Sequence, residues 1–185
     1  MKSLKELYRI GYGPSSSHTM GPRAAAEQYL AKHPEAKRFQ VTLYGSLAAT
    51  GRGHLTDWAI LDVIGKDRCE IKWCAEIILP YHPNGMLFQA IDDAGKPYDP
   101  WTVYSVGGGA LAEEGHSSIQ TPDVYELNHL NDIIKWCDER GYSYWQFVEH
   151  FEESDIWDYL EEVWKVMCQA VERGVETEGV LPGGL

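Results

Sequence analysis

The spacing of apolar residues changes once along this chain, near Pro122, and this change constrains the fold more than any other feature. Before it, apolar runs such as the alternating Phe39, Val41 and Leu43 are short and separated by glycine-rich polar turns, which is typical of strands. After it, apolar residues recur every three or four positions, as on one face of a helix. We therefore expect a sheet-bearing core over residues 1–121 and a helical extension over residues 122–185.

The core should contain helices as well as strands. Helices are expected from Leu4 to Tyr8, where Ser3 opens a capping-box pattern, from Met20 to Lys32 and from Trp58 to Ile64. The Asn84-Gly85 pair between two apolar runs predicts a hairpin turn. Strands are expected over Phe39–Tyr44, Cys69–Trp73, Ala75–Leu79, Met86–Ile91 and Trp101–Val106.

Composition excludes several classes of protein. A net charge of −12 disfavours nucleic acid and anionic membranes as partners, because both reward clustered Lys and Arg. No apolar run reaches the roughly 20 residues of a membrane-spanning helix, and a secretory signal is lacking, so a cytoplasmic protein is expected. The cysteines show no C-x-x-C spacing, which disfavours a metal site and predicts buried free thiols. They are Cys69, Cys74, Cys137 and Cys168.

The first polar segment, Gly13–Pro22, places three serines and a histidine directly before a helix. Unpaired amides and the positive end of the helix dipole favour an anion there, and hydroxyls can donate further hydrogen bonds to it. The alternative is an ordinary serine-rich helix cap.

The second polar segment, Gly45–Asp57, follows an expected strand and combines three glycines with His54, two threonines and an aspartate. Backbone amides in such a turn can approach a small anion, but the glycine spacing matches neither a P-loop nor a dinucleotide fingerprint. Alternatively, Thr56 and Asp57 only cap the next helix.

The third polar segment, Tyr81–Met86, contains His82 and Asn84, although a turn alone would also explain it. The later Gly107, Gly108 and Gly109 permit a bulge or a close approach of backbone to a ligand.

Five motifs, in this order, resemble the beta domain of iron–sulfur-dependent L-serine dehydratase, also called L-serine ammonia-lyase. They are G-P-S-S-S-H-T at Gly13–Thr19, Y-G-S-L-A-x-T-G-x-G-H-x-T-D at Tyr44–Asp57, H-x-N-G-M at His82–Met86, Y-S-V-G-G-G at Tyr104–Gly109, and R-G-x-x-x-E-G-V-L-P-G at Arg173–Gly183.

The resemblance implies a lyase of amino-acid degradation that converts L-serine to pyruvate and ammonia without pyridoxal phosphate. It implies a 4Fe–4S cluster in the complete enzyme, with ligand cysteines outside this chain and no metal site within it. It also implies an α+β fold around a mixed sheet, similar to the allosteric substrate-binding domain of some phosphoglycerate dehydrogenases, followed by the helical segment.

Matching the motifs residue by residue implies a catalytic set with His54 as general base, supported by His82 and Asn84. The implied substrate-binding set is Ser15, Ser16, Ser17, His18, Thr19, Thr56, Ser105, Gly107 and Gly108. The histidines outside the motifs should be structural or on the surface, and they are His33, His116, His129 and His150.

Two departures from the family pattern qualify the resemblance. The span between the second and third motifs is shorter than in the single-chain members, and the family continues past L-P-G into a helical alpha domain. We therefore expect the N-terminal half of a single-chain enzyme, inactive alone, whose partners are L-serine, the alpha domain and a second copy in a homodimer. The acidic extension from Glu113 to Glu178 should bind the alpha domain.

Two other classes of function remain open from the residues. A non-catalytic module that senses serine or another small carboxylate could use the same serines and glycine turns without a converging His54. A serine hydrolase is disfavoured because the sequence has no G-x-S-x-G elbow.

Overall fold

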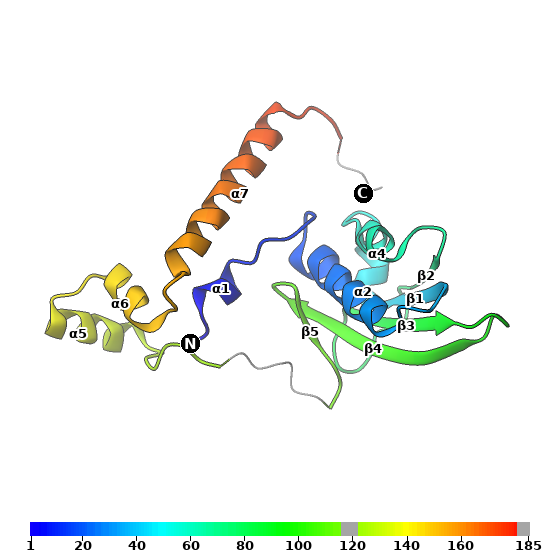
Figure 1. Ribbon diagram of the computed structural model, residues 1–185, viewed down its shortest axis with the longest axis horizontal. Helices are drawn as coiled ribbons and strands as arrows, with labels where there is room; N and C mark the ends of the chain where they lie inside the picture. The colour runs from blue at the N-terminus through cyan, green and yellow to red at the C-terminus, as the bar shows by residue number, and fades with distance from the viewer. Residues whose placement is uncertain (116–121, 181–185) are drawn as a thin grey trace. The chain divides into compact units, whose positions relative to one another are not determined.

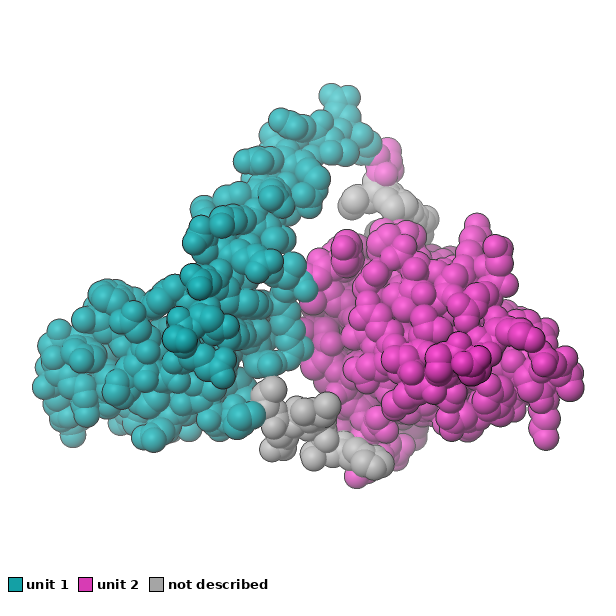
Figure 2. Space-filling model, in the orientation of Figure 1, with its two compact units in different colours: residues 1–10, 120–179 teal, residues 11–119, 180–185 magenta. Residues whose placement is uncertain are grey.

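The computed structural model describes residues 1–115 and 122–180, which belong to two compact units (Figure 2). The sheet unit spans residues 11–119 and 180–185, and the helical unit spans residues 1–10 and 120–179. The domain boundary expected between residues 121 and 122 stays a prediction. His116 and the Leu181–Gly183 end of the fifth motif lie outside the described residues.

The sheet unit is built on five strands in the order β2-β1-β3-β4-β5 (Figure 1). The strands are β1 (Arg38–Tyr44), β2 (Cys69–Cys74), β3 (Gly85–Ile91), β4 (Pro97–Gly107) and β5 (Ala110–Ala112). β1 and β2 run parallel, whereas the other neighbouring pairs are antiparallel. The expected α+β class with a mixed sheet is therefore confirmed, and the finer resemblance to an allosteric domain stays a prediction.

Helical segments before β1 and between β1 and β2 pack against the sheet. They are a π-helical turn (Ser16–Met20), α2 (Gly21–Lys32), α3 (Gly45–Thr50) and α4 (Thr56–Ile64). α3 and α4 lie between β1 and β2 in the chain and so provide the crossover that a parallel pair requires. α2 and α4 pack against each other (Figure 1).

The main core lies between these helices and the sheet. Alternate residues of β1, namely Phe39, Val41 and Leu43, are buried against it, as their spacing predicts. Tyr29 of α2 is buried at its centre. It binds the sheet where the register between β3 and β4 shifts, between Phe88 and Ala90. Its hydroxyl accepts a hydrogen bond from the Ala90 amide at 2.9 Å and donates one to the Asp99 carbonyl at 2.6 Å.

Two local predictions for this unit are wrong. Ala75–Leu79 is not a strand, and its side chains Ile77 and Ile78 are exposed. The Asn84-Gly85 pair does not close a hairpin, because β2 and β3 pair with opposite edges of β1 rather than with each other. The residues between β2 and β3 instead cross the end of β1, which carries His82 toward the other polar segments.

The helical unit contains the helices predicted beyond Pro122 together with the first short helix. They are α1 (Leu4–Leu7), α5 (Leu130–Arg140), α6 (Tyr144–Phe151) and α7 (Ile156–Glu176). Tyr125, Cys137 and Phe147 form a small core of their own. Among the helices that the structure describes, none is long and apolar enough to cross a bilayer.

Glu152 joins the N-terminal residues of the helical unit to its helices. Its carboxylate accepts hydrogen bonds from Ser3 Oγ at 2.6 Å, the Leu4 amide at 2.7 Å and the Tyr125 hydroxyl at 2.6 Å. Burial opposes ionisation of Glu152, but the hydrogen bonds from Ser3, Tyr125 and Leu4 outweigh it and lower the pKa of the carboxyl. The helical unit therefore stabilises the ionised form of Glu152.

The four cysteines are free, as expected, but their burial differs from the prediction. Cys137 is buried, whereas Cys69, Cys74 and Cys168 are partly exposed. Burial raises the pKa of the Cys69 thiol to about 12, so this sulfur stays protonated and unreactive.

Candidate active site

Three polar segments that are distant in sequence meet beyond the carboxyl end of β1. His18 Nε2 lies 3.2 Å from Ser46 Oγ in the segment after β1. The Ser46 amide in turn donates to the Pro83 carbonyl at 3.1 Å. Gly45 permits this approach, because its φ is +48° and a Cβ there would lie 2.6 Å from the Pro83 oxygen. The motifs that carry His18, His54 and His82 therefore converge.

His18 is held at both ring nitrogens. Nδ1 lies 2.9 Å from Ser17 Oγ, and Nε2 lies 3.2 Å from Ser46 Oγ. Burial, together with the neighbouring His54 ring, lowers the pKa of His18 below its ordinary 6.5. A neutral ring with both nitrogens engaged is suited to orienting other groups rather than to moving protons.

His54 differs from His18 in having one nitrogen available. Its Nδ1 lies 3.0 Å from the Thr50 carbonyl, which can only accept, so Nδ1 of the neutral ring carries the proton. Within the described part of the chain, no hydrogen bond engages Nε2, which therefore presents a lone pair. The ring is partly exposed, and its centroid lies 4.9 Å from that of His18.

The serines before α2 occupy different environments. Ser15 Oγ accepts from the His18 amide at 3.2 Å and caps the π-helical turn, which runs directly into α2. Ser16 is exposed, and Ser17 is bound to the His18 ring. The amides of Ser16 and Ser17 begin the helical segment and have no partner within it. Unpaired amides at the start of a helical segment favour an anion.

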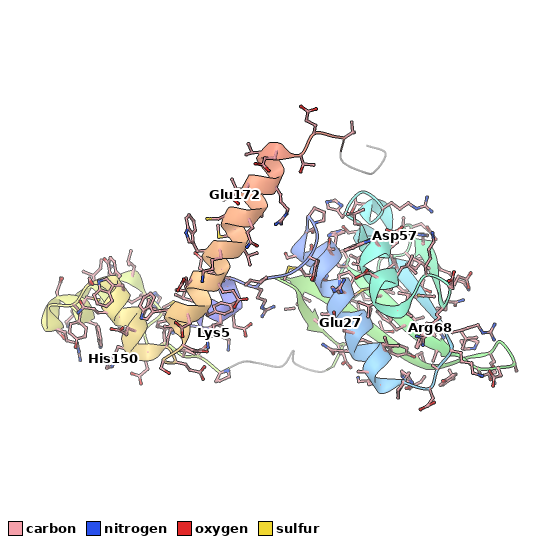
Figure 3. All side chains as sticks on the ribbon, turned by 45° about the horizontal axis from the view of Figure 1, so that its top comes forward. Lys5, Glu27, Asp57, Arg68, His150 and Glu172 are labelled. Atoms are coloured by element: carbon pink, nitrogen blue, oxygen red, sulfur yellow. The ribbon has the colours of Figure 1, made fainter. Side chains whose placement is uncertain are left out.

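Thr19 and Thr56 are both fully buried, and their hydroxyls bond to backbone. Thr19 Oγ1 donates to the His54 carbonyl at 2.9 Å, and Thr56 Oγ1 donates to the His18 carbonyl at 2.6 Å. The alternative in which Thr56 caps α4 is wrong, because Leu55 occupies the cap position. Asp57, at the start of α4 (Figure 3), accepts a hydrogen bond from the Trp58 amide at 2.9 Å.

His82, Asn84 and Ser105 are linked to one another by hydrogen bonds. His82 Nδ1 accepts from the Asn84 amide at 3.1 Å, so the proton of the neutral ring lies on Nε2. Asn84 is buried, and its Nδ2 donates to the Ser105 carbonyl at 3.2 Å, while the Ser105 amide donates to the Asn84 carbonyl at 3.0 Å. Ser105 Oγ is buried and has no hydrogen-bond partner among the described residues.

The glycine turn lies between β4 and β5. Gly107, Gly108 and Gly109 all have positive φ, so the turn depends on glycine. A Cβ on Gly109 would lie 3.4 Å from Met20, which places this turn beside the π-helical turn. The catalytic and binding roles expected for Gly107, Gly108, the serines, the threonines, His18, His54, His82 and Asn84 stay predictions.

The sequence alone does not single out Ser46 or Gly21, although both contact residues of this site. Ser46 links His18 to Pro83, and its place between a strand and a helix in the Y-G-S-L motif was the available signal. Gly21 packs against Ser105, but glycine at the start of a helix gives no sign of a distant partner.

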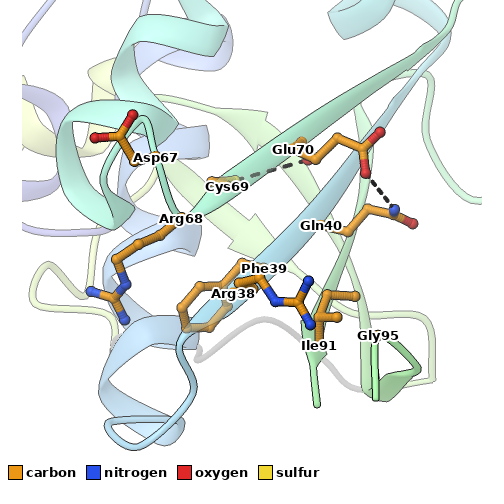
Figure 4. Close-up of a pocket in the computed structure, with 9 residues that line it drawn as sticks. All are labelled: Arg38, Phe39, Gln40, Asp67, Arg68, Cys69, Glu70, Ile91 and Gly95. Carbon is orange, nitrogen blue, oxygen red and sulfur yellow. Dashed lines mark hydrogen bonds between the residues drawn. The ribbon is translucent and has the colours of Figure 1, made fainter. Parts of the chain in front are cut away.

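The structure also contains a hollow of about 330 Å³ at the amino ends of β1 and β2, at the opposite end of these strands from His18 and His54 (Figure 4). Arg38 and Arg68 line it, but both guanidinium groups already donate to backbone carbonyls. Gln40 and Glu70 are likewise paired with each other. We therefore assign no ligand to this hollow.

The described residues do not fit an iron–sulfur cluster. They contain no group of three or more His, Cys, Asp or Glu side chains that could hold a metal ion. Cys69 and Cys74 lie at the two ends of β2, whereas Cys137 and Cys168 lie in α5 and α7 of the other unit. Cluster ligation needs several thiolates at one point, which this distribution does not provide.

Comparison with known proteins gives a family match. The family model described as serine dehydratase beta chain matches residues 3–68 and 62–116. The two matched ranges overlap between the second and third polar segments, where the chain is expected to be shorter than its relatives.

Curated relatives match the chain along its whole length. They include an L-serine dehydratase of Haemophilus influenzae (30% identical over 237 residues), L-serine dehydratase TdcG of Escherichia coli (32% over 235) and an L-serine dehydratase of Streptomyces coelicolor (34% over 235). The matches cover 99–100% of this chain but 52% of each relative. The chain therefore spans about half the length of the curated relatives it matches.

Proposed function

The chain belongs to the serine dehydratase beta chain family, and from this membership we propose that it forms the substrate-binding and proton-removing half of an L-serine dehydratase. The complete enzyme would convert L-serine to pyruvate and ammonia. The relatives named L-serine dehydratase favour this activity over a purely sensing module. Because the chain spans about half of each relative, the rest of the enzyme would be a partner alpha domain, and we expect a cytoplasmic homodimer.

The state of His54 is the observation that carries this proposal. Removal of the weakly acidic Cα proton of serine needs a base whose pKa lies near neutral pH, and imidazole is the usual choice. The Thr50 carbonyl fixes the proton on Nδ1, which leaves Nε2 as the atom that would accept the Cα proton. His18, bonded at both nitrogens, would hold its place without competing for that proton.

The substrate carboxylate would bind at the start of the π-helical turn. The Ser16 hydroxyl and the Ser16 and Ser17 amides would donate to it there, where the helix dipole also favours negative charge. Ser15 would keep the turn closed through its bond to the His18 amide. His82, with its proton on Nε2, and Asn84 would border the other side and orient the substrate.

Proton removal at Cα with loss of the Cβ hydroxyl as water yields 2-aminoacrylate. Tautomerisation gives the imine, and water then hydrolyses it to pyruvate and ammonia. An acid for the departing hydroxyl is not evident among the residues of this site. The 4Fe–4S cluster implied by the family resemblance does not fit the described residues, so we confine the role of this chain to binding and proton removal.

The proposal is tested by reconstitution. This chain would be combined anaerobically with the half of the Streptomyces coelicolor L-serine dehydratase that it does not match, and pyruvate formation from L-serine would be measured. We expect activity from the mixture and none from either piece alone. His54→Gln should lower turnover by about 10²-fold or more, as expected for loss of a general base.

The control is Lys66→Gln, which changes an exposed residue of the sheet unit outside the three polar segments and should leave turnover unchanged. A His54→Gln variant that keeps more than about a tenth of the wild-type rate would exclude His54 as the base. Pyruvate formation by this chain alone would contradict the proposed division of labour.

A further inference from the structure

Thr19 and Thr56 stand at the junction of the two histidine-bearing segments. Thr19 lies in the π-helical turn directly after His18, and Thr56 begins α4 two residues after His54. Both side chains have 0% of their surface exposed. A threonine with no exposed surface cannot contact a substrate while the fold is closed, so its hydroxyl must serve another group.

The two hydrogen bonds of these threonines are reciprocal. Thr19 donates to the carbonyl of His54 at 2.9 Å, and Thr56 donates to the carbonyl of His18 at 2.6 Å. Each hydroxyl therefore binds the backbone of the histidine on the opposite segment. One such bond would leave the segments free to rotate about it, whereas two bonds in opposite directions fix both their spacing and their relative rotation.

Glycines of both motifs pack against these threonines. A Cβ on Gly13 would lie 2.1 Å from Thr19 Cγ2, and Gly13 has a φ of +89°. A Cβ on Gly51 would lie 3.1 Å from Thr56 Oγ1. A side chain in place of either glycine would therefore displace the threonine that packs against it.

The backbone between His54 and Thr56 is held in an unfavourable conformation. Leu55 has φ 59° and ψ 34°, in the left-handed region that residues other than glycine avoid. Such a conformation persists only where the surrounding structure enforces it, and it occurs preferentially at functional sites. The bonds on either side of Leu55, from Thr19 to His54 and from Thr56 to His18, provide that enforcement.

We infer that Thr19 and Thr56 are positioning residues that set the separation of the His18 and His54 rings, whose centroids lie 4.9 Å apart. This inference rests on the proposed function for its catalytic meaning, because it deepens the role of the same site. The threonine hydroxyls would hold the base and its neighbour in place, rather than binding L-serine as their motif positions suggested.

The test uses NMR of the full chain without substrate, so it does not depend on dehydratase activity. In the wild type we expect NOEs between the His18 and His54 ring protons. In Thr56→Val, which keeps the shape but removes the hydroxyl, these NOEs should weaken. The pKa of His18 should also rise toward 6.5, because a more distant His54 lowers it less.

The matched variant Thr56→Ser keeps the hydroxyl and should retain both the NOEs and the His18 pKa. Thr19→Val and Thr19→Ser repeat the comparison from the other side, in case Thr56→Val fails to fold. Amide spectra of the strands would establish that each variant is folded. A purely structural threonine would lower the unfolding temperature without moving the His18 pKa.

Two outcomes would overturn the inference: no ring NOEs in the wild type, or unchanged NOEs and His18 pKa in the folded Val variants. Failure of the reconstituted enzyme would count against the proposed function alone. The two failures are therefore distinguishable.

Discussion

Gly21 leaves the space that the Ser105 side chain occupies: a Cβ on Gly21 would lie 2.1 Å from Ser105 Oγ and 2.9 Å from Ser105 Cβ. Gly21 is the first residue of α2, and Ser105 lies in β4. This contact sets how closely the helix that carries the serine segment approaches the sheet. Ser105 is fully buried, so its side chain has little room to move away.

Gly21→Ala should destabilise the sheet unit by about 1–3 kcal/mol, because it overpacks a closed contact. Urea unfolding with hydrogen exchange at sheet-unit amides would measure the loss. Gly174→Ala is the control, since a Cβ there meets nothing within 4 Å in α7. It should be neutral or stabilise by up to about 1 kcal/mol. Equal effects of both substitutions would contradict a specific Gly21–Ser105 contact.

Acid should weaken the sheet unit through His18. The pKa of His18 is lowered in the folded chain by burial and by His54, so the unfolded chain takes up the proton more readily. This contribution to stability is fully present above about pH 6.5 and is lost as the pH falls through 6.5 toward the folded pKa.

His18→Gln should therefore flatten the decline of the unfolding free energy between neutral and mildly acidic pH, even if it lowers the value at neutral pH. Urea unfolding over that range, with an NMR titration of the His18 ring, measures both quantities. If the unfolding free energies of the wild type and His18→Gln declined in parallel with falling pH, His18 would not be the group responsible.

Tyr29→Phe should cost about 1–3 kcal/mol of the free energy of unfolding, because the buried Ala90 amide loses its acceptor and the Asp99 carbonyl loses its donor. Burial raises the pKa of Tyr29 to about 12, so the hydroxyl stays protonated and able to donate at neutral pH. Tyr98→Phe in β4 is the control, since Tyr98 is 42% exposed. A loss no larger than that of Tyr98→Phe in urea unfolding would argue against the buried bonds.

Glu152→Gln should destabilise the helical unit by about 1–3 kcal/mol, because an amide cannot accept all the hydrogen bonds that the carboxylate accepts from Ser3, Leu4 and Tyr125. Glu153→Gln removes an exposed ion pair with Lys5 and should cost under about 1 kcal/mol. Far-UV circular dichroism during urea unfolding would compare them. A larger loss of unfolding free energy for Glu153→Gln than for Glu152→Gln would contradict the stabilising role of the Glu152 hydrogen bonds.

Strands and helices with a strong local pattern could be predicted from the sequence. Phe39, Val41 and Leu43 alternate because one face of β1 is buried, and the helices after Pro122 repeat at helical spacing. The hairpin predicted at Asn84-Gly85 is wrong because this residue pair indicates only a local turn. Strand order depends instead on which edge of β1 each strand joins. Ala75–Leu79 misled because its apolar content is that of a strand, although the chain there only crosses the end of β1.

The convergence of the histidine motifs was predictable, since each motif lies at the end of a strand or helix. The partners of individual groups were not. Nothing local to Thr19 or Thr56 indicates that each hydroxyl reaches the carbonyl of the other segment's histidine. The tautomer of His54 likewise depends on the Thr50 carbonyl, which only the folded turn brings within 3.0 Å.

The paired hydrogen bonds between Asn84 and Ser105 also order the assembly of the site in time. His18 and His54 leave the ribosome well before β4 does, yet Asn84 gains these two hydrogen bonds only when Ser105 has followed. A nascent chain that ends before β4 would therefore carry both histidines without the Asn84–Ser105 pair. Protection of the Ser105 amide from exchange with solvent would mark the moment at which this pair forms.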